Sequence, residues 1–557
     1  MFRTELQVRK VRPSGGRRLV TLLLALWSVV PVHAQSPNDT KFLSTLGELR
    51  EATYSDKESI VERLGKTDHP SVRAALTAFL EDRLYFRNSD QKVFIVKAAD
   101  ADPLNLIDPL SLKDAGAAPA DSLTKIGTNN GLRRVLRTTV AHFALSSPEV
   151  AVRLEAAREM SRSLDDATVA FLRERLGVET NSGVKKEIAA GLALAALDGP
   201  DAKARLEAIA MLSQSLSQDV RNRLALLLAK SPDGSFAESD EQVRRAAAAA
   251  VQTIDHWRTF YADIGTLFFG LSMGSVLVLI AIGLAITFGV MGVINMAHGE
   301  LMMLGAYTTY AVQTAMPGHI GISVLAAIPA AFIVAGLTGV LMERTIIRFL
   351  YGRPLETLLA TFGVSLILQQ SVRSIFSALN RSVVTPEWMS GSLRLNDALD
   401  LTYNRLYIVI FTLIVFSLIL VVMKRTRMGL DIRAVAQNRA MAKAMGIRTE
   451  WVDAMTFGLG SGVAGVAGVA LSQLTNVGPN LGQSYIIDSF MVVVFGGVGN
   501  LWGSLIGGMS MGIVNELLEP FAGAVLAKIF VLVALILFIQ RRPRGLFPQA
   551  GRASEDK

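Results

Sequence analysis

The chain has 557 residues, of which 51% are hydrophobic and 19% are charged, below the roughly 25% charged residues usual in soluble domains. It contains no cysteine, which excludes disulfides, thiolate catalysis and cysteine-ligated metal sites. The net charge of +8 does not indicate nucleic-acid binding, because much of the excess lies in the N-terminal leader and in short loops between apolar stretches, where positive charge sets membrane topology.

The first 34 residues are typical of a secretory signal peptide. A basic region that ends at Arg18 is followed by a short apolar run, Leu19 to Val30, and then by Val32-His33-Ala34. This order predicts cleavage after Ala34. An uncleaved anchor helix is the alternative, but the apolar run is short for a membrane span. In either case the residues that follow are expected outside the cytoplasm.

Residues 35–256 are rich in charge and alanine and show helical periodicity with few strand signals. A valine followed by basic residues recurs along this segment and opens several helices, as at Val152-Arg153, Val184-Lys185 and Val220-Arg221. Repeats of two helices stack into solenoids. The pattern resembles degenerate HEAT-like repeats, although the period drifts and an irregular helical bundle remains open.

Apolar stretches long enough to cross a membrane fill the second half of the chain. A spanning helix needs about 20 apolar residues, and residues 264–299 contain no Asp, Glu, Lys or Arg. The predicted spans are 265–290, 292–314, 320–342, 355–379, 405–423, 451–472, 486–518 and 524–540. We therefore predict an all-α chain, with an exported helical domain before a polytopic transmembrane domain at 264–548 and a cytoplasmic tail at 549–557.

The basic residues of the connections predict the orientation of these spans. Residues 424–448 and 541–552 are rich in arginine and lysine and should be cytoplasmic. Five spans precede residue 424, so residue 264 should lie outside. This agrees with the export predicted from the leader, and both features indicate a bacterial inner membrane protein with a periplasmic N-terminal domain.

The long stretch 486–518 should contain a break. Both ends of the block after residue 448 are expected in the cytoplasm, so the number of crossings there must be even. Gly496-Gly497-Val498-Gly499-Asn500 interrupts the stretch, and broken helices in membranes are tolerated where they are buried in protein or line a polar cavity. Gly496, Gly497 and Asn500 are therefore candidate substrate-pathway residues.

Three polar residues lie between the first two apolar spans. Asn295, His298 and Glu300 belong to the stretch Gly283 to Tyr307, and polar groups inside a membrane are costly and often functional. They are also candidates for the substrate pathway. The alternative is that they cap a tight turn near the cytoplasmic face, and spacing alone does not decide between the two.

The cytoplasmic loop from Arg427 to Ile447 has an alanine-rich, amphipathic centre that ends at Gly446. A short exposed helix held between two spans can receive a soluble partner. An ordinary basic loop that only sets topology is the alternative. The candidate docking residues are Arg433, Ala434, Asn438, Ala442, Met445 and Gly446.

A third informative stretch is FGGVGNLWGSLIGG, from Phe495 to Gly508, together with the terminal RRPRGLF at 541–547. With INMAHGE and RAVAQN…MGI, and in this order, these stretches resemble the permease subunit of ABC importers of the branched-chain amino acid type. The resemblance covers about residues 264–548. It implies a polytopic transmembrane helical permease that transports and is not itself an enzyme.

The resemblance also implies partners. These are two cytoplasmic ATPase subunits, a second homologous permease, and a periplasmic substrate-binding protein, in addition to the lipid bilayer. The loop around Arg433 to Gly446 corresponds to the segment that receives the ATPase. The exported helical domain before the permease is similar to that of the urea-type permeases, which makes urea or a short-chain amide the preferred substrate and branched-chain amino acids the alternative.

Other classes of function are disfavoured by what the sequence lacks. A membrane-anchored sensor needs a cytoplasmic output domain, and none follows Gln540. A membrane enzyme needs a catalytic constellation, and no paired carboxylates or nucleophile with a base is recognisable. The six histidines show no metal-ligand spacing, so we expect no metal and no cofactor. A passive urea channel would need no docking loop for an ATPase.

Overall fold

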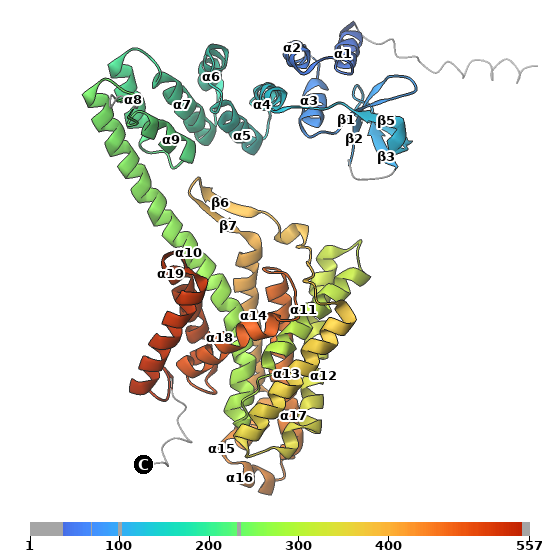
Figure 1. Cartoon of the computed structure of the whole chain (residues 1–557), viewed down its shortest axis with the longest axis vertical. Coiled ribbons are helices and arrows are strands. Elements are labelled where there is room, and N and C mark those ends of the chain that lie inside the picture. The colour runs from blue at the N-terminus through green and yellow to red at the C-terminus, as the bar shows by residue number, and fades with distance from the viewer. Residues whose placement is uncertain (1–36, 68, 99–102, 231–235, 548–557) are drawn as a thin grey trace, which may run out of the picture. The chain divides into compact units, whose positions relative to one another are not determined.

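The computed structural model describes residues 37–67, 69–98, 103–230 and 236–547 (Figure 1). The predicted signal peptide and the tail at 549–557 lie outside these residues. The described residues divide into two compact units. The first comprises the residues up to Ser213 with Leu226–Ala247, and the second comprises Gln214–Ala225 with the residues from Ala248 onward.

The first unit begins with three helices that pack on a small sheet. Its helices are α1 (Pro37–Glu48), α2 (Tyr54–Gly65), α3 (Val72–Leu80), α4 (Asn130–Ala144), α5 (Val150–Met160), α6 (Asp166–Val178), α7 (Ser182–Ala196) and α8 (Ala202–Leu212). Helix α5 contacts α4 and α7, and α7 contacts α6 and α8. The helices from α4 to α8 therefore form a stack in which α5 packs on α7, the second helix after it in the chain.

The first unit contains a five-stranded antiparallel sheet, whereas the sequence predicts an all-helical domain with few strand signals. The strands are β1 (Leu84–Arg87), β2 (Val93–Val96), β3 (Leu104–Ile107), β4 (Asp114–Ala118) and β5 (Leu123–Lys125), in the order β4-β3-β2-β1-β5. All four residues of β2 are buried. Val93 and Ile95 join the core under the helices, while Phe94 and Val96 join a second cluster on the other face.

Arginines at helix starts anchor the connections of the helical stack. The Arg153 side chain donates to the carbonyls of Ser147 and Pro148 at 2.8 and 3.0 Å, and Arg205 donates to the carbonyl of Gly199 at 2.7 Å. Each therefore holds the loop that precedes its own helix. Of these two arginines only Arg153 belongs to the recurring valine–basic pattern, since Arg221 pairs with Asp255, and the HEAT-like repeats remain a prediction.

The second unit is a helical bundle with one external β-hairpin, β6 (Ser392–Asn396) and β7 (Leu399–Thr402). Two helices have residues in both units, α9 (Gln218–Leu226) and α10 (Glu241–Met291). The other helices of the second unit are α11 (His298–Ala315), α12 (Ile320–Thr345), α13 (Pro354–Phe376), α14 (Tyr403–Arg425), α15 (Arg427–Gln437), α16 (Arg439–Ala444), α17 (Thr449–Ser472), α18 (Leu481–Gly496) and α19 (Leu501–Arg541).

The long apolar stretch at 486–518 is broken as predicted, since α18 ends at Gly496 and α19 begins at Leu501. Helix α19 is itself two helices, because Gly523 has the non-helical dihedral angles φ 77° and ψ 159°. Met511 and Val514 before this residue line the same cleft as Val531 and Leu535 after it. The two halves of α19 therefore form a helical hairpin.

Within the described residues, six helices are long and apolar enough to cross a membrane: α10, the segment formed by α12 and the turn after it, α13, α14, α17 and α19. Helix α18 is apolar but shorter. The chain is thus mainly helical and polytopic, which confirms the predicted fold class.

Glycines let the helices of the bundle approach closely. A Cβ atom built on Gly274 of α10 would lie 2.7 Å from the carbonyl oxygen of Gly508 in α19, and one on Gly512 would lie 2.4 Å from the Cα of Gly274. Backbones at this separation leave no room for a side chain. Gly270 and Gly274 of α10, and Gly508 and Gly512 of α19, each four positions apart, therefore form one helix crossing.

Candidate functional site

The turn between α10 and α11 carries Asn295, His298 and Glu300 into the interior of the bundle. Helix α10 ends at Met291, and Gly292 takes the left-handed conformation with φ 67° that favours glycine. The Asn295 Oδ1 atom accepts a hydrogen bond from the backbone N–H of Ala297 at 3.0 Å, which shapes the turn into α11. All three polar side chains are at most 1% exposed.

Glu300 links α11 to α13. Its Oε1 atom accepts hydrogen bonds from Gln369 Nε2 at 2.8 Å and from Ser365 Oγ at 3.2 Å. The second oxygen, Oε2, is buried without a hydrogen-bond partner. It faces Gly482 of α18, where a built Cβ atom would lie 2.7 Å away. The carboxyl group is therefore held on one side and unpartnered on the other.

His298 points instead toward α10. Its Nε2 atom lies 3.0 Å from the carbonyl oxygen of Ile280. A carbonyl oxygen only accepts, so Nε2 carries the proton and Nδ1 is left as an acceptor. Nδ1 is buried without a partner. The first turn of α11 therefore presents two unpartnered acceptor atoms, Nδ1 of His298 and Oε2 of Glu300, inside the bundle.

Sequence reasoning missed Ser365 and Gln369, the partners of Glu300. Both are buried polar residues in the apolar span α13. The rule that polar groups within a span are costly applies to them as it does to Glu300. Their pairing with a residue more than sixty positions earlier depends on how α11 and α13 pack, which the sequence pattern does not give.

Gly496 is the last residue of α18, Gly497 and Asn500 lie in the loop before α19, and all three contact the C-terminal segment. The Asn500 Oδ1 atom caps α19 by accepting from the N–H groups of Trp502 and Gly503 at 3.0 and 3.2 Å. Its Nδ2 donates to the carbonyl of Phe547 at 3.3 Å, and the N–H of Phe547 donates to the carbonyl of Gly496 at 3.1 Å.

Gly497 has φ 102°, and a Cβ atom there would lie 2.6 Å from the carbonyl oxygen of Phe547. The hydrogen bonds of Gly496 and Asn500 thus serve local capping or hold the terminal segment. The structure does not join these three residues to Glu300 or His298 by a hydrogen bond.

The predicted docking loop forms two short helices, α15 and α16. Thr426 Oγ1 accepts from Gly429 N–H at 3.1 Å, and Asn438 Oδ1 accepts from Met441 N–H at 2.9 Å, so a polar side chain caps the start of each helix. Gly446, with φ 89°, ends the segment. Asn438 and Gly446 therefore have structural roles that fix where the helices begin and end.

Only some of the predicted docking residues face outward. Ala442 is 5% exposed and packs into the bundle core with Ile432 and Val435, and Ala434 packs against this core. Arg433 is exposed, and Met445 is 77% exposed. Two further large apolar residues on the outer surface, Leu430 and Met441, were not predicted. Exposed apolar side chains on capped helices make an interaction surface.

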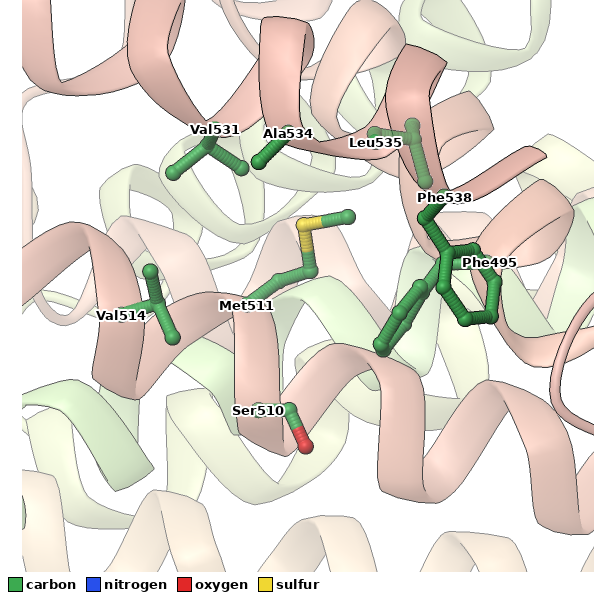
Figure 2. Close-up of a pocket in the computed structure, with 8 residues that line it drawn as sticks. All are labelled: Phe495, Ser510, Met511, Val514, Val531, Ala534, Leu535 and Phe538. Atoms are coloured by element: carbon green, nitrogen blue, oxygen red, sulfur yellow. The ribbon is translucent and has the colours of Figure 1, made fainter. Parts of the chain in front are cut away.

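An apolar cleft of about 280 Å³ opens between α18 and the two halves of α19. Figure 2 shows Met511 of the first half facing Val531 and Leu535 of the second, with Phe495 and Phe538 closing one end. Ser510 supplies the one hydroxyl group among the lining residues. This lining offers packing surface rather than groups for chemistry. Among the described residues, no cluster of His, Asp or Glu side chains could hold a metal ion.

A bundle of helices long and apolar enough to cross a membrane, with buried polar groups and an exposed helix pair, is the architecture of a polytopic membrane protein. The family model described as "Branched-chain amino acid transport system / permease component" matches residues 266–539. The chain belongs to this family of ABC importer permeases. No solved structure matches the chain.

Curated relatives carry the same description. The chain is 31% identical over 303 residues to the high-affinity branched-chain amino acid transport system permease protein LivH of Salmonella typhimurium, a match that covers 52% of this chain and 96% of the relative. It is 31% identical over 297 residues to the corresponding protein BraD of Pseudomonas aeruginosa, covering 52% and 95%. The first unit of the structure ends at Ala247 and lies wholly before the residues that the family model matches.

Proposed function

We propose that this chain is the membrane-spanning subunit of an ABC importer and that it moves a small polar solute inward across the bacterial inner membrane. The observation that carries the proposal is the match of nearly the full length of curated permeases to the helical bundle. In this proposal the chain catalyses no reaction itself, and ATP hydrolysis belongs to its partners.

The distribution of charge supports an orientation with α15, α16 and the C-terminus in the cytoplasm. The loops after α12 and α14 and the end of α19 are rich in arginine and lysine. The segments at 316–319 and 473–480 contain none. Positive residues remain preferentially on the cytoplasmic side. This orientation leaves the β6–β7 hairpin and the N-terminal unit on the periplasmic side.

The exposed surface of α15 and α16 supports docking of two cytoplasmic ATPases, one on this chain and one on a second homologous permease. Leu430, Met441 and Met445 are each more than half exposed. Thioether side chains adapt to the shape of a partner. Arg433 adds a cation beside them.

On the other side of the membrane, a soluble substrate-binding protein would deliver the solute. The helical stack of the first unit is suited to bind this substrate-binding protein.

The substrate path is proposed to pass the first turn of α11. Buried acceptor atoms without a protein partner, Nδ1 of His298 and Oε2 of Glu300, can accept hydrogen bonds from a passing amide or ammonium group. Asn295 Nδ2 is likewise buried without a partner and can donate. Gly496, Gly497 and Asn500 are proposed to act indirectly, through the mobility that a break between two helices gives.

For the substrate, the names of the relatives favour branched-chain amino acids over the urea or short-chain amide preferred from the sequence resemblance. Urea or a short-chain amide is the second candidate, because the family model matches only from residue 266 and leaves the N-terminal unit unaccounted for.

The experiment is uptake by the complete importer in proteoliposomes, with binding protein outside and ATP inside, using labelled leucine and labelled urea in parallel. ATP-dependent accumulation of either solute supports the importer, and the preferred solute assigns the substrate. Flux that runs equally without ATP or without the binding protein would indicate a passive channel and contradict the proposal.

A further inference from the structure

A basic cleft of about 630 Å³ lies where α12 and α17 reach the arginine-rich end of the bundle. It is outside the proposed substrate path and beside the docking helices. Its lining combines cationic side chains with one large aromatic ring. The lining residues are Arg344, Lys443, Gly446, Ile447, Arg448, Thr449, Glu450 and Trp451.

The cations of the cleft are only partly neutralised by the protein. Arg344 lies 3.6 Å from Glu343, which takes up part of its charge. Lys443 and Arg448 are exposed, and among the described residues no ion pair involves either of them. Glu450 is the one acidic lining residue. An anion that enters the cleft therefore meets an excess of positive charge.

The lipid-facing side of α12 leads into this cleft. Ile333, Leu337 and Leu341 are 55%, 65% and 61% exposed and recur at every fourth position, so they form one apolar stripe. Arg344 follows on the same face one turn later. An exposed apolar stripe on a membrane-spanning helix faces acyl chains, and a cation at its end lies at the level of the headgroups.

An aromatic residue at the same level completes the arrangement. Trp451 is 58% exposed, and the Arg344 guanidinium lies 5.3 Å from the centre of its ring. Met455, one turn further along α17, is also exposed. Tryptophan is enriched at the membrane interface, where one side of the ring is apolar and the other is wet.

We propose that this cleft binds the headgroup of an anionic phospholipid, whose acyl chains lie along the stripe Ile333, Leu337 and Leu341. The lipid phosphate would be held by Arg344, Lys443 and Arg448. Clusters of basic residues next to a spanning helix bind anionic headgroups in this way. Because Lys443 belongs to α16 and Arg344 to α12, the bound lipid joins the docking helices to the membrane-spanning helices.

The test measures bound lipid on the intact complex. The wild type and variants are reconstituted in nanodiscs of equal parts phosphatidylglycerol and phosphatidylcholine, and retained lipids are counted by native mass spectrometry. We expect selective retention of phosphatidylglycerol. Removing one cation should lower the occupancy of bound phosphatidylglycerol by roughly five-fold. Arg344→Gln and the double variant Arg344→Gln/Arg448→Gln should therefore show successive losses of this lipid.

Lys424→Gln is the matched control, because Lys424 is an exposed cation at the same end of the bundle but does not line the cleft. It should retain phosphatidylglycerol like the wild type. Equal retention by all variants, or an equal loss in Lys424→Gln, would overturn the proposal. The proposal would also be overturned if a partner protein covers Trp451 in the intact complex and no lipid is bound there.

A second measurement tests the proposal if the double variant Arg344→Gln/Arg448→Gln does not assemble. Tryptophan fluorescence is recorded in nanodiscs that contain brominated phosphatidylglycerol, for the wild type and for Trp451→Phe. Quenching should be smaller in Trp451→Phe, because the ring beside the bound lipid is missing. Identical quenching in both proteins would contradict a lipid at this position.

Discussion

Arg439 of α16 and Asp453 of α17 form a two-point ion pair that ties the exposed helix pair to a membrane-spanning helix. Arg439 Nη1 lies 3.0 Å from Asp453 Oδ1, and Nη2 contacts Oδ2. The Asp453 carboxylate is 4% exposed. The guanidinium also lies 4.1 Å from the centre of the Tyr351 ring, after α12. A force applied to α16 therefore reaches α17 through a fixed contact.

Breaking this pair should uncouple the importer. Asp453→Asn keeps the shape of the side chain but leaves the partly buried Arg439 guanidinium without its counter-charge. We expect ATP hydrolysis stimulated by the loaded binding protein to fall by roughly ten-fold, equivalent to about 1.4 kcal/mol. Glu356→Gln, which removes the acid of the exposed Arg353–Glu356 ion pair at the start of α13, should behave like the wild type. Normal stimulation in Asp453→Asn would contradict a mechanical role for the pair.

The hydrogen bonds of Glu300 should matter more than its charge. Glu300→Gln keeps an oxygen that can accept from Gln369 and Ser365, so the melting temperature of the purified complex should change little. Glu300→Ala removes this acceptor, leaves Gln369 Nε2 only its 3.3 Å contact with Ser365 Oγ inside the bundle, and should cost about 1–3 kcal/mol. An uptake assay then distinguishes a structural role of Glu300 from a role in transport. If the substrate contacts Oε2, Glu300→Gln lowers uptake in a complex of wild-type stability, and equal uptake would reduce Glu300 to a structural residue.

The crossing of α10 and α19 predicts a contrast between two glycines. A Cβ atom on Gly274 would lie 2.7 Å from a backbone oxygen of α19, whereas one on Gly363 of α13 would meet no atom within 4 Å. Gly274→Ala should force the helices apart and cost about 1–3 kcal/mol. Gly363→Ala should be neutral or stabilise by up to about 1 kcal/mol, because alanine is the better helix former. Thermal unfolding of the two variants checks the contrast, and similar melting temperatures would show that the crossing is looser than described.

Much of the membrane half could be predicted from sequence, and the reasons are physical. A bilayer demands a fixed apolar length, so most spans and the break at Gly496 to Asn500 follow from composition alone. The sheet of the N-terminal unit was missed because its strands are short. Strand β5, for example, has only three residues, Leu123–Lys125, which is too few to show an alternation of apolar and polar residues. The site was found only in part. Burial of Ala442, and the pairing of Glu300 with Gln369, depend on packing between distant segments.

A buried ion pair in the N-terminal unit predicts a dependence on pH. Burial raises the pKa of Glu179, but Arg153 and the backbone N–H groups of Asn181 and Thr180 donate hydrogen bonds to its carboxylate and lower it, with a net pKa of about 2 against an ordinary 4.5. The unfolded chain therefore takes up the proton first as pH falls. The stability that this pair contributes is complete above about pH 4.5 and is lost between that pH and about pH 2.

Glu179→Gln should accordingly destabilise α5 to α7 at neutral pH by about 3 kcal/mol, because Arg153 loses its buried partner. Hydrogen exchange of peptides from these helices in the full-length protein measures the change. The difference from the wild type should shrink as the pH is lowered below 4.5. Glu174→Gln, an exposed neighbour on α6, is the control and should leave exchange unchanged. Wild-type protection in Glu179→Gln at pH 7 would show that the pair is not stabilising.

The absence of cysteine from the chain makes one measurement especially direct. Met445→Cys on α16 and Leu395→Cys on β6 each introduce a single thiol at an exposed position. In intact spheroplasts, a membrane-impermeant maleimide should label Leu395→Cys and leave Met445→Cys unlabelled. In the assembled complex, a short thiol cross-linker should join Met445→Cys, and not Leu395→Cys, to the ATPase subunit. Labelling of Met445→Cys from outside, or its failure to cross-link in a complex that hydrolyses ATP, would contradict the account of α15 and α16 as the segment that receives the ATPase.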